Sequence, residues 1–263
     1  MIEAFIFIFT GALTGIAAGL FGLGGGLIIV PVVTYSLISF SNISFNQAIL
    51  SGICTSLASM VITGAMASYI HTKNKNIDFK IINKFLIGVV FGALLIGFII
   101  NIFPGKVLKN FFIIYTFFIA FRIYTEKNNV IKNSTQNNFI SNLVGFIISI
   151  ISGLVGIGGA TLFVPLLIRN NIPAKLAIGT SSALGFIIGL GASISIYFSS
   201  LYLEVTNNSM FGFVYLPAIL FLTMPSLIFV QLSANWLLKI SDANVKKLFS
   251  SMLLIIGLLM LLN

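Results

Sequence analysis

Long apolar runs, separated by short polar segments, account for most of the chain. Runs of about 20 apolar residues, the length that lets a helix cross a bilayer, occupy the ranges 48–70, 82–103, 107–125, 174–198, 211–235 and 245–262. Two more apolar regions, 3–40 and 139–169, are each interrupted by a cluster of glycines and continue as a shorter apolar piece. As a helix, the piece 160–169 would reach only about 15 Å, about half of the bilayer core. The pattern therefore predicts spanning helices, together with two helices that are broken or re-entrant.

The two glycine clusters repeat one motif. Residues 19–31 read GLFGLGGGLIIVP, and residues 153–165 read GLVGIGGATLFVP. With the second copy placed 134 positions after the first, four glycines and the final proline coincide, and Gly26 is matched by Ala160. The matched glycines are Gly19, Gly22, Gly24 and Gly25 in the first copy and Gly153, Gly156, Gly158 and Gly159 in the second. Glycine-interrupted segments at matching places in two halves of a hydrophobic chain are typical of transporters built from repeats, with the substrate site between the breaks.

The composition is that of a membrane protein. Of the 263 residues, 58% are hydrophobic and 7% are charged, and the mean hydropathy is +1.13. So few polar residues cannot cover the surface of a soluble domain of this length. We therefore predict an all-α polytopic membrane protein of two repeats, with roughly four to five helical segments in each.

Basic residues indicate how the chain lies in the membrane. Of the 14 lysines and arginines, all but Lys106 and Lys109 lie in the segments 71–84, 122–138, 169–175 and 236–247, on one side of the predicted bilayer. Since cytoplasmic loops are rich in basic residues, the sequence predicts these four segments in the cytoplasm and both termini outside. Each half then makes an odd number of net crossings, so the two repeats are expected to be inverted.

A polar segment divides the chain into these halves. We expect an N-terminal membrane repeat at 1–125, a cytoplasmic linker at 126–138 and a C-terminal membrane repeat at 139–263. The net charge of +9 is spread over short loops and forms no long basic tract. The expected partners are therefore the lipid bilayer and a small anionic substrate, and not a nucleic acid.

The glycine breaks are the predicted substrate site. Glycine lets a substrate approach main-chain amides, and the half-helix after each break presents free N–H groups and the positive end of its dipole, which suit an anion. A Thr-Ser pair in the next long helix of each half adds hydroxyl donors. The candidate substrate-binding residues are Gly22, Gly24, Gly25, Gly26, Thr55, Ser56, Gly156, Gly158, Gly159, Thr180 and Ser181. Each feature also has a structural explanation, since glycines let membrane helices pack closely and buried Ser and Thr bond to their own helix.

Other kinds of chemistry find little support in the sequence. The five acidic residues fall in loops or at segment ends, whereas proton- or sodium-coupled pumps commonly keep a carboxylate in the membrane. We find no residue pattern for an enzyme, a metal or a cofactor. The single cysteine, Cys54, excludes an internal disulfide, and we expect it to be a packing residue. His71, near a helix end, is expected at the membrane interface.

The doubled motif Gly-x-x-Gly-x-Gly-Gly-[Gly/Ala]-x-x-x-x-Pro, followed in each half by Thr-Ser within a helix, resembles that of the TauE/SafE sulfite-exporter family of membrane permeases. The resemblance covers essentially the whole chain. It implies about eight spans and transport of small sulfur-containing anions, such as sulfite, sulfonates or sulfoacetate, across the bacterial inner membrane. Two departures make equivalent half-sites unexpected: Ala160 replaces a glycine, and the spacing from Pro to Thr is 24 residues in the first half and 15 in the second.

These observations predict a transporter whose glycine breaks meet near the midplane and hold an oxyanion while one repeat rocks against the other. A passive channel for small anions is the alternative within transport. Two other classes stay open. One is a membrane scaffold in which the glycines only pack helices, and the other is a sulfur-handling membrane protein that depends on the thiol of Cys54.

Overall fold

The first half of the chain contributes five α-helices and a short 3-10 helix. The computed structural model describes residues 2–22, 24–125, 137–200, 210–237 and 242–262. In chain order the first elements are α1 (Ile2–Phe21), α2 (Gly26–Ser41), α3 (Phe45–Lys73), α4 (Phe79–Ile99), η1 (Ile100–Ile102) and α5 (Gly105–Thr125). The break predicted within 3–40 is the gap between α1 and α2, and α2 is 16 residues long.

The second half repeats this order of helices and adds a small hairpin. Its elements are α6 (Asn138–Val155), α7 (Ala160–Arg169), α8 (Ala174–Ser200), β1 (Met210–Phe211), β2 (Val214–Tyr215), α9 (Leu216–Leu237) and α10 (Asp242–Leu262). With 10 residues, α7 has the predicted length of a half-helix. The helix predicted over 211–235 begins instead at Leu216, because β1 and β2 form an antiparallel hairpin that turns at Gly212 with a φ of +61°.

The predicted all-α polytopic class is confirmed. Six described helices are long and apolar enough to cross a membrane, namely α1, α3, α4, α6, α8 and α9. The sequence also predicts spans at α5 and α10, and both are helices of 21 residues. Of the predicted linker 126–138, residues 126–136 lie outside the described part of the chain, and α6 begins at Asn138.

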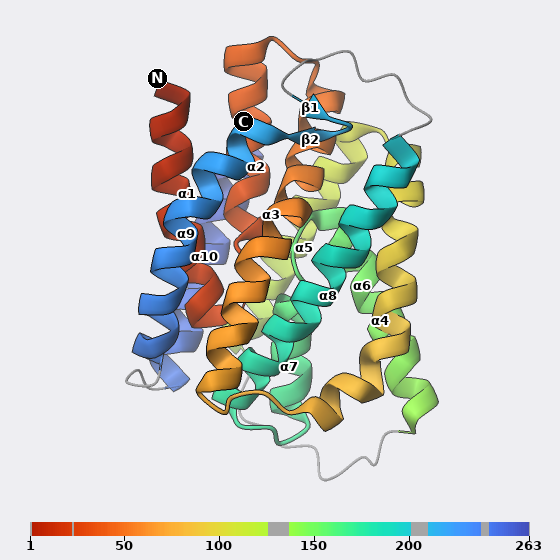
Figure 1. The fold of residues 1–263 in the computed structure, drawn as a ribbon, viewed down its shortest axis with the longest axis vertical. Coiled ribbons are helices and arrows are strands. Elements are labelled where there is room, and N and C mark those ends of the chain that lie inside the picture. The colour runs from red at the N-terminus through yellow and green to blue at the C-terminus, as the bar shows by residue number, and fades with distance from the viewer. Residues whose placement is uncertain (1, 23, 126–136, 201–209, 238–241, 263) are drawn as a thin grey trace.

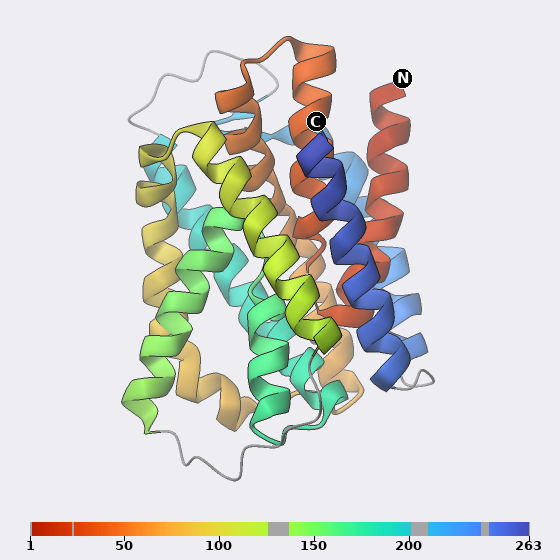
Figure 2. The same cartoon turned by 180° about the vertical axis from the view of Figure 1, so that it is seen from behind.

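The two broken hairpins enter the molecule from opposite ends (Figures 1 and 2). α1 leads inward from one end, and after the first break α2 returns to that same end. α6 and α7 form a hairpin of the same kind from the opposite end, where the α3–α4 and α7–α8 connections also lie. Lys73, Lys80, Arg169 and Lys175 lie at or near the helix ends that meet at this second end, whereas Lys106 starts α5 at the other.

The helix contacts recur with a shift of five helices. α1 packs mainly against α9, and α6 packs mainly against α4; α2 packs against α3, as α7 does against α8. α3 and α8 contact each other at the centre, and α5 contacts α10. A long helix of each half thus covers the broken hairpin of the other, so neither half would bury its apolar surface alone.

Two glycines of the motif serve this packing. A Cβ on Gly19 would lie 2.1 Å from the Ser233 Oγ of α9, and a Cβ on Gly153 would lie 2.0 Å from the Ile96 Cδ1 of α4. Both glycines lie inside the helices that precede the breaks. For these two positions the close-packing explanation holds, since a side chain would meet the backbone of α9 at Gly19 and the packed Ile96 side chain at Gly153.

Candidate functional site

The first break is a run of left-handed backbone. Gly22, Gly24 and Gly25 have φ angles of +71°, +63° and +81°, a region that residues with a side chain rarely adopt. Gly25 is the N-cap of α2 and makes no side-chain cap. Its carbonyl accepts a hydrogen bond of 3.0 Å from the Ile28 N–H, so the first turn of α2 starts directly from the break.

The second break also has left-handed glycines at both of its ends, but the backbone between them differs from that of the first break. Gly156 closes α6 with a φ of +76°, and the Ile157 N–H donates to the Ser152 carbonyl at 2.8 Å. Gly159 is the N-cap of α7 with a φ of +72°. Gly158, the match of Gly24, is not among the described residues with positive φ. The two breaks are therefore similar but not identical, and they differ at a position that is glycine in both copies.

The two breaks contact each other in the protein interior. A Cβ on Gly26, the first residue of α2, would lie 2.0 Å from the carbonyl oxygen of Gly156. The Ser56 hydroxyl of α3 donates to the same carbonyl oxygen at 2.7 Å. All three residues are buried. The start of α2 thus lies against the end of α6, where Gly156 closes that helix, and Ser56 of the Thr-Ser motif donates to the same carbonyl.

Met60 fills the space between the breaks. Its side chain would lie 2.7 Å from a Cβ on Gly24 and 2.2 Å from a Cβ on Gly158. The Thr63 hydroxyl, one turn further along α3, donates to the Gly24 carbonyl at 3.2 Å. Sequence reasoning missed both residues, because a methionine and a threonine in an apolar helix carry no signal of what lies opposite. A flexible thioether is well suited to a space that changes shape.

The two predicted threonines hold helix starts in the opposite half. Thr55 Oγ1 of α3 accepts the Tyr215 N–H at 2.9 Å, directly before α9 begins. Thr180 Oγ1 of α8 accepts the Asp78 N–H at 3.0 Å, directly before α4 begins. The two contacts correspond under the shift of five helices. In this conformation each threonine oxygen thus accepts a hydrogen bond from a main-chain N–H group. The described contacts include no acceptor for the hydroxyl hydrogen of either threonine.

The predicted serines differ between the halves. Ser56 has the partner described above, whereas Ser181, in the matching pair, is fully buried and meets no hydrogen-bond partner. The next residue, Ser182, donates to the Ile178 carbonyl at 3.0 Å. A Cβ on Gly22 would lie 2.6 Å from the Ser182 Oγ, so the α8 hydroxyls border the first break.

A further group of hydroxyls borders the second break. Tyr115 of α5 is hydrogen-bonded to Thr161, the second residue of α7. Ser152, in the last turn of α6, is fully buried beside the Tyr115 hydroxyl. The matching positions of the first repeat, Ala18 and Leu27, are apolar. The sequence analysis missed this group, although a threonine in the first turn of a half-helix was a usable signal.

A buried tyrosine, Tyr215, contacts Glu3 at the end of the molecule where α1 begins. The Tyr215 hydroxyl donates to Glu3 Oε1 at 3.0 Å, and its ring packs edge-on against Phe7 with centroids 6.2 Å apart. Burial and then the hydrogen bond and charge of Glu3 raise the pKa of Tyr215 to about 12. The phenol therefore stays protonated throughout the physiological range of pH.

The remaining candidates lie away from the breaks or are inert in this conformation. Cys54 is a free cysteine, fully buried in the main hydrophobic core. His71 lies in the last turn of α3, two residues before its end at Lys73, and is fully buried within the protein. Among the described residues, no three His, Cys, Asp or Glu side chains are grouped so as to hold a metal ion.

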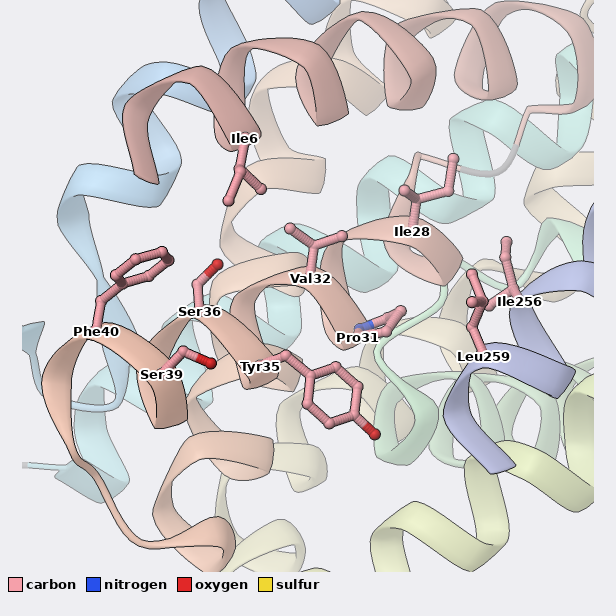
Figure 3. Close-up of a pocket in the computed structure, with 10 residues that line it drawn as sticks. All are labelled: Ile6, Ile28, Pro31, Val32, Tyr35, Ser36, Ser39, Phe40, Ile256 and Leu259. Carbon is pink, nitrogen blue, oxygen red and sulfur yellow. The ribbon is translucent and has the colours of Figure 1, made fainter. Parts of the chain in front are cut away.

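An apolar groove lies outside the predicted site (Figure 3). It has a volume of about 390 Å³, and it lies between α1, α2 and α10. Its polar lining side chains are Tyr35, Ser36 and Ser39. None of the eleven predicted substrate-binding residues lines it, so it does not contribute to the contact between the breaks.

Comparison with known proteins agrees with this geometry. A family model described as "Sulfite exporter TauE/SafE" matches residues 7–260. The chain belongs to the TauE/SafE family. A probable membrane transporter protein of Haemophilus influenzae is 28% identical over 254 residues, which are 96% of each chain. A probable membrane transporter protein of Methanocaldococcus jannaschii is 30% identical over 261 residues, 98% of this chain and 95% of the relative. No solved structure gives a significant match.

Family membership and the fold together establish the class of function. The chain is a TauE/SafE membrane transporter that crosses the bilayer several times and acts on a small substrate. The family match covers both glycine breaks and both Thr-Ser pairs.

Proposed function

We propose that this TauE/SafE transporter carries small sulfur-containing oxyanions, of the sulfite, sulfonate or sulfoacetate type, by alternating access between its two glycine breaks. The start of α2 contacts the second break at Gly156, which precedes the start of α7 at Ala160. Each start offers unpaired N–H groups and the positive end of a helix dipole. The described carboxylates Glu3 and Asp78 contact Tyr215 and the start of α4, so the two helix starts favour an anion over a cation.

The observation that carries the proposal is the hydrogen bond from Ser56 to the Gly156 carbonyl. This bond joins α3 of the first half to the break of the second half, at the same carbonyl that Gly26 of the first break contacts. A neutral hydrogen bond contributes about 1 kcal/mol, and one to a charged group contributes about 1.5–3 kcal/mol. An oxyanion that accepts from Ser56 therefore replaces a weaker bond with a stronger one, and it releases the contact that holds the two breaks together.

This exchange supplies a physical link between binding and movement. The space between the breaks is closed in this conformation, because Gly26 and Met60 occupy it. We take the halves 1–125 and 139–263 as inverted repeats and as the moving units, so that rocking one against the other exposes the site to each side in turn. The end that carries most of the basic residues is placed in the cytoplasm, and the membrane is the bacterial inner membrane.

Ligand-dependent thermal stability tests the proposal. A ligand that binds the folded state raises its apparent melting temperature. The purified protein in detergent is therefore heated with sulfite, thiosulfate, sulfate, sulfoacetate, taurine, acetate or chloride. We expect a selective rise with a sulfur oxyanion, and we expect Gly24→Val to lose most of it, because valine is strained at a φ of +63° and clashes with Met60.

The matched control is Gly257→Ala, whose Cβ would lie 3.3 Å from the Phe117 ring and would meet no residue of either break. This variant is expected to keep the full anion effect. An unchanged effect in Gly24→Val would contradict the site, and equal shifts with acetate, chloride and the sulfur oxyanions would contradict the substrate class.

A further inference from the structure

A small cavity lies at the basic end of the molecule, between α4, α6 and the end of α7. Its volume is about 130 Å³, and its lining includes Lys84, Phe85, Ser141 and Asn170. A buried water needs only about 10–15 Å³ of such space. The cavity therefore has room for a small anion together with some of its hydration water.

The polar groups around the cavity are donors. Lys84 contributes a positive charge and Asn170 a side-chain amide. Ser141 is 1% exposed, and its hydroxyl meets no hydrogen-bond partner. A buried hydroxyl without an acceptor carries a free-energy cost that a ligand oxygen would remove. These groups together select a ligand that is small, negatively charged and rich in acceptor oxygens.

The helix ends around the cavity are already capped within the protein. The Asp78 carboxylate accepts from the Lys80 and Ile81 N–H groups at the start of α4, and the Asn137 side chain accepts from the Phe139 N–H at the start of α6. α7 ends at the cavity, and its last carbonyls are also occupied: the Leu167 carbonyl accepts from the N–H groups of Asn170 and Ile172 at 3.0 and 3.1 Å. These described caps are thus used within the protein, whereas the Ser141 hydroxyl meets no hydrogen-bond partner.

Comparison of the repeats explains why the cavity exists in one half. At the offset of 134 positions, Ser141 corresponds to Phe7 and Leu167 to Val33. Phe7 and Val33 pack with Tyr215 in one buried cluster, and the Phe7 and Tyr215 rings are in edge contact. The phenyl ring that fills this position in the first repeat is replaced by a hydroxymethyl group in the second, which leaves space at the basic end.

The cavity also connects to the second glycine break. Phe85, which lines it, packs edge-on against Phe163 of α7 with ring centroids 5.4 Å apart. The Phe163 ring in turn would lie 3.2 Å from a Cβ on Gly159, the N-cap of α7. Two aromatic rings thus separate the cavity from the start of the half-helix.

We propose that this cavity is a binding site for a small oxyanion and serves as the vestibule from which the transported anion reaches the second break. The inference rests on the transport function proposed above. It assigns Lys84 and Ser141 to anion capture, and it assigns the Phe85–Phe163 pair to the barrier between vestibule and break.

Sulfite flux into proteoliposomes tests the vestibule. The initial rate of entry of radiolabelled sulfite is measured against sulfite concentration for the wild type, Ser141→Phe and Lys84→Gln. Ser141→Phe places in the cavity the ring that the first repeat has there, so we expect KM to rise about tenfold or more. Lys84→Gln removes the charge from an exposed position, so we expect KM to rise about threefold to fivefold, and less at high ionic strength.

The matched control is Lys80→Gln, which removes the same charge one turn earlier on α4, at an exposed residue outside the lining. We expect its KM to stay within about twofold of the wild type. If Ser141→Phe does not insert into membranes, Lys84→Gln and its salt dependence decide the question.

The outcomes separate this inference from the function on which it rests. Saturable wild-type flux with an unchanged KM in Lys84→Gln and in any folded Ser141→Phe protein would overturn the vestibule and leave the transport function standing. Equal effects of Lys84→Gln and Lys80→Gln would reduce the vestibule to general surface charge and would also overturn it. Absence of saturable sulfite flux in the wild type would overturn the transport function, and the vestibule with it.

Discussion

Adding one methyl group at Gly26 tests whether contact between the two breaks controls transport. Gly26 is the first residue of α2, and it is not among the described glycines with positive φ. Alanine therefore fits its backbone, as Ala160 does at the matching place in the second repeat. The obstacle is the other break, since the new Cβ would lie 2.0 Å from the Gly156 carbonyl oxygen and 2.8 Å from the Ser56 Oγ.

The size of the perturbation follows from these distances. To reach the 3.4 Å of an ordinary contact from 2.0 Å, the breaks must separate by about 1.4 Å. Forced overpacking of this kind costs about 1–3 kcal/mol. The same movement stretches the 2.7 Å hydrogen bond between Ser56 and Gly156, which removes about 1 kcal/mol more. We expect Gly26→Ala to insert into membranes, to melt at a lower temperature and to transport sulfite at least tenfold more slowly.

The assay compares sulfite flux in proteoliposomes with the melting temperature of the same preparation. Gly64→Ala is the matched control, because its Cβ would lie 3.3 Å from the Phe186 backbone, a contact that needs only a small adjustment. This control is expected to keep at least half of the wild-type rate. Gly26→Ala with wild-type flux and an unchanged melting temperature would refute the argument that the breaks must close on each other.

Two further substitutions test contacts near the helix starts. Thr180→Val leaves the Asp78 N–H without its acceptor at 3.0 Å and should destabilise the protein by about 1 kcal/mol. Thr180→Ser keeps the hydroxyl and should keep the wild-type melting temperature. Equal losses of melting temperature in both variants would assign the effect to packing. Tyr215 has a pKa raised to about 12 from an ordinary value of about 10, so its contribution to stability is full below about pH 10 and is lost as the pH rises through 12. Tyr215→Phe, which removes the bond to Glu3, should melt below the wild type near pH 8, and the difference should narrow above pH 10; a difference independent of pH would contradict the ionisation argument.

Much of the fold could be predicted from the sequence because apolar length and glycine interruptions act locally. The apolar runs became helices, and α7 is the predicted half-helix of 10 residues. The exception near Leu216 has a local cause as well. Residues 211–215 are apolar enough to extend a helix, but Gly212 turns the chain into a hairpin. Hydropathy alone does not separate these two outcomes.

The candidate site was only partly predictable. The glycines could be recognised, because left-handed backbone at Gly25 and Gly159 requires glycine wherever it occurs in the fold. Their surroundings depend on contacts between residues about 100 positions apart, such as Ser56 with Gly156. Met60 is the clearest case, since its position between the breaks follows from how α3 packs and leaves no pattern in the sequence.

Counterflow in proteoliposomes tests the central claim most directly. Vesicles that contain the wild-type protein are loaded with unlabelled sulfite and diluted into a trace of radiolabelled sulfite. A site that alternates between the two sides exchanges label for the unlabelled anion, so the account predicts a transient accumulation of label above its equilibrium level. Entry of label that rises without an overshoot, and that does not saturate with sulfite, would contradict alternating access and would identify a passive anion channel.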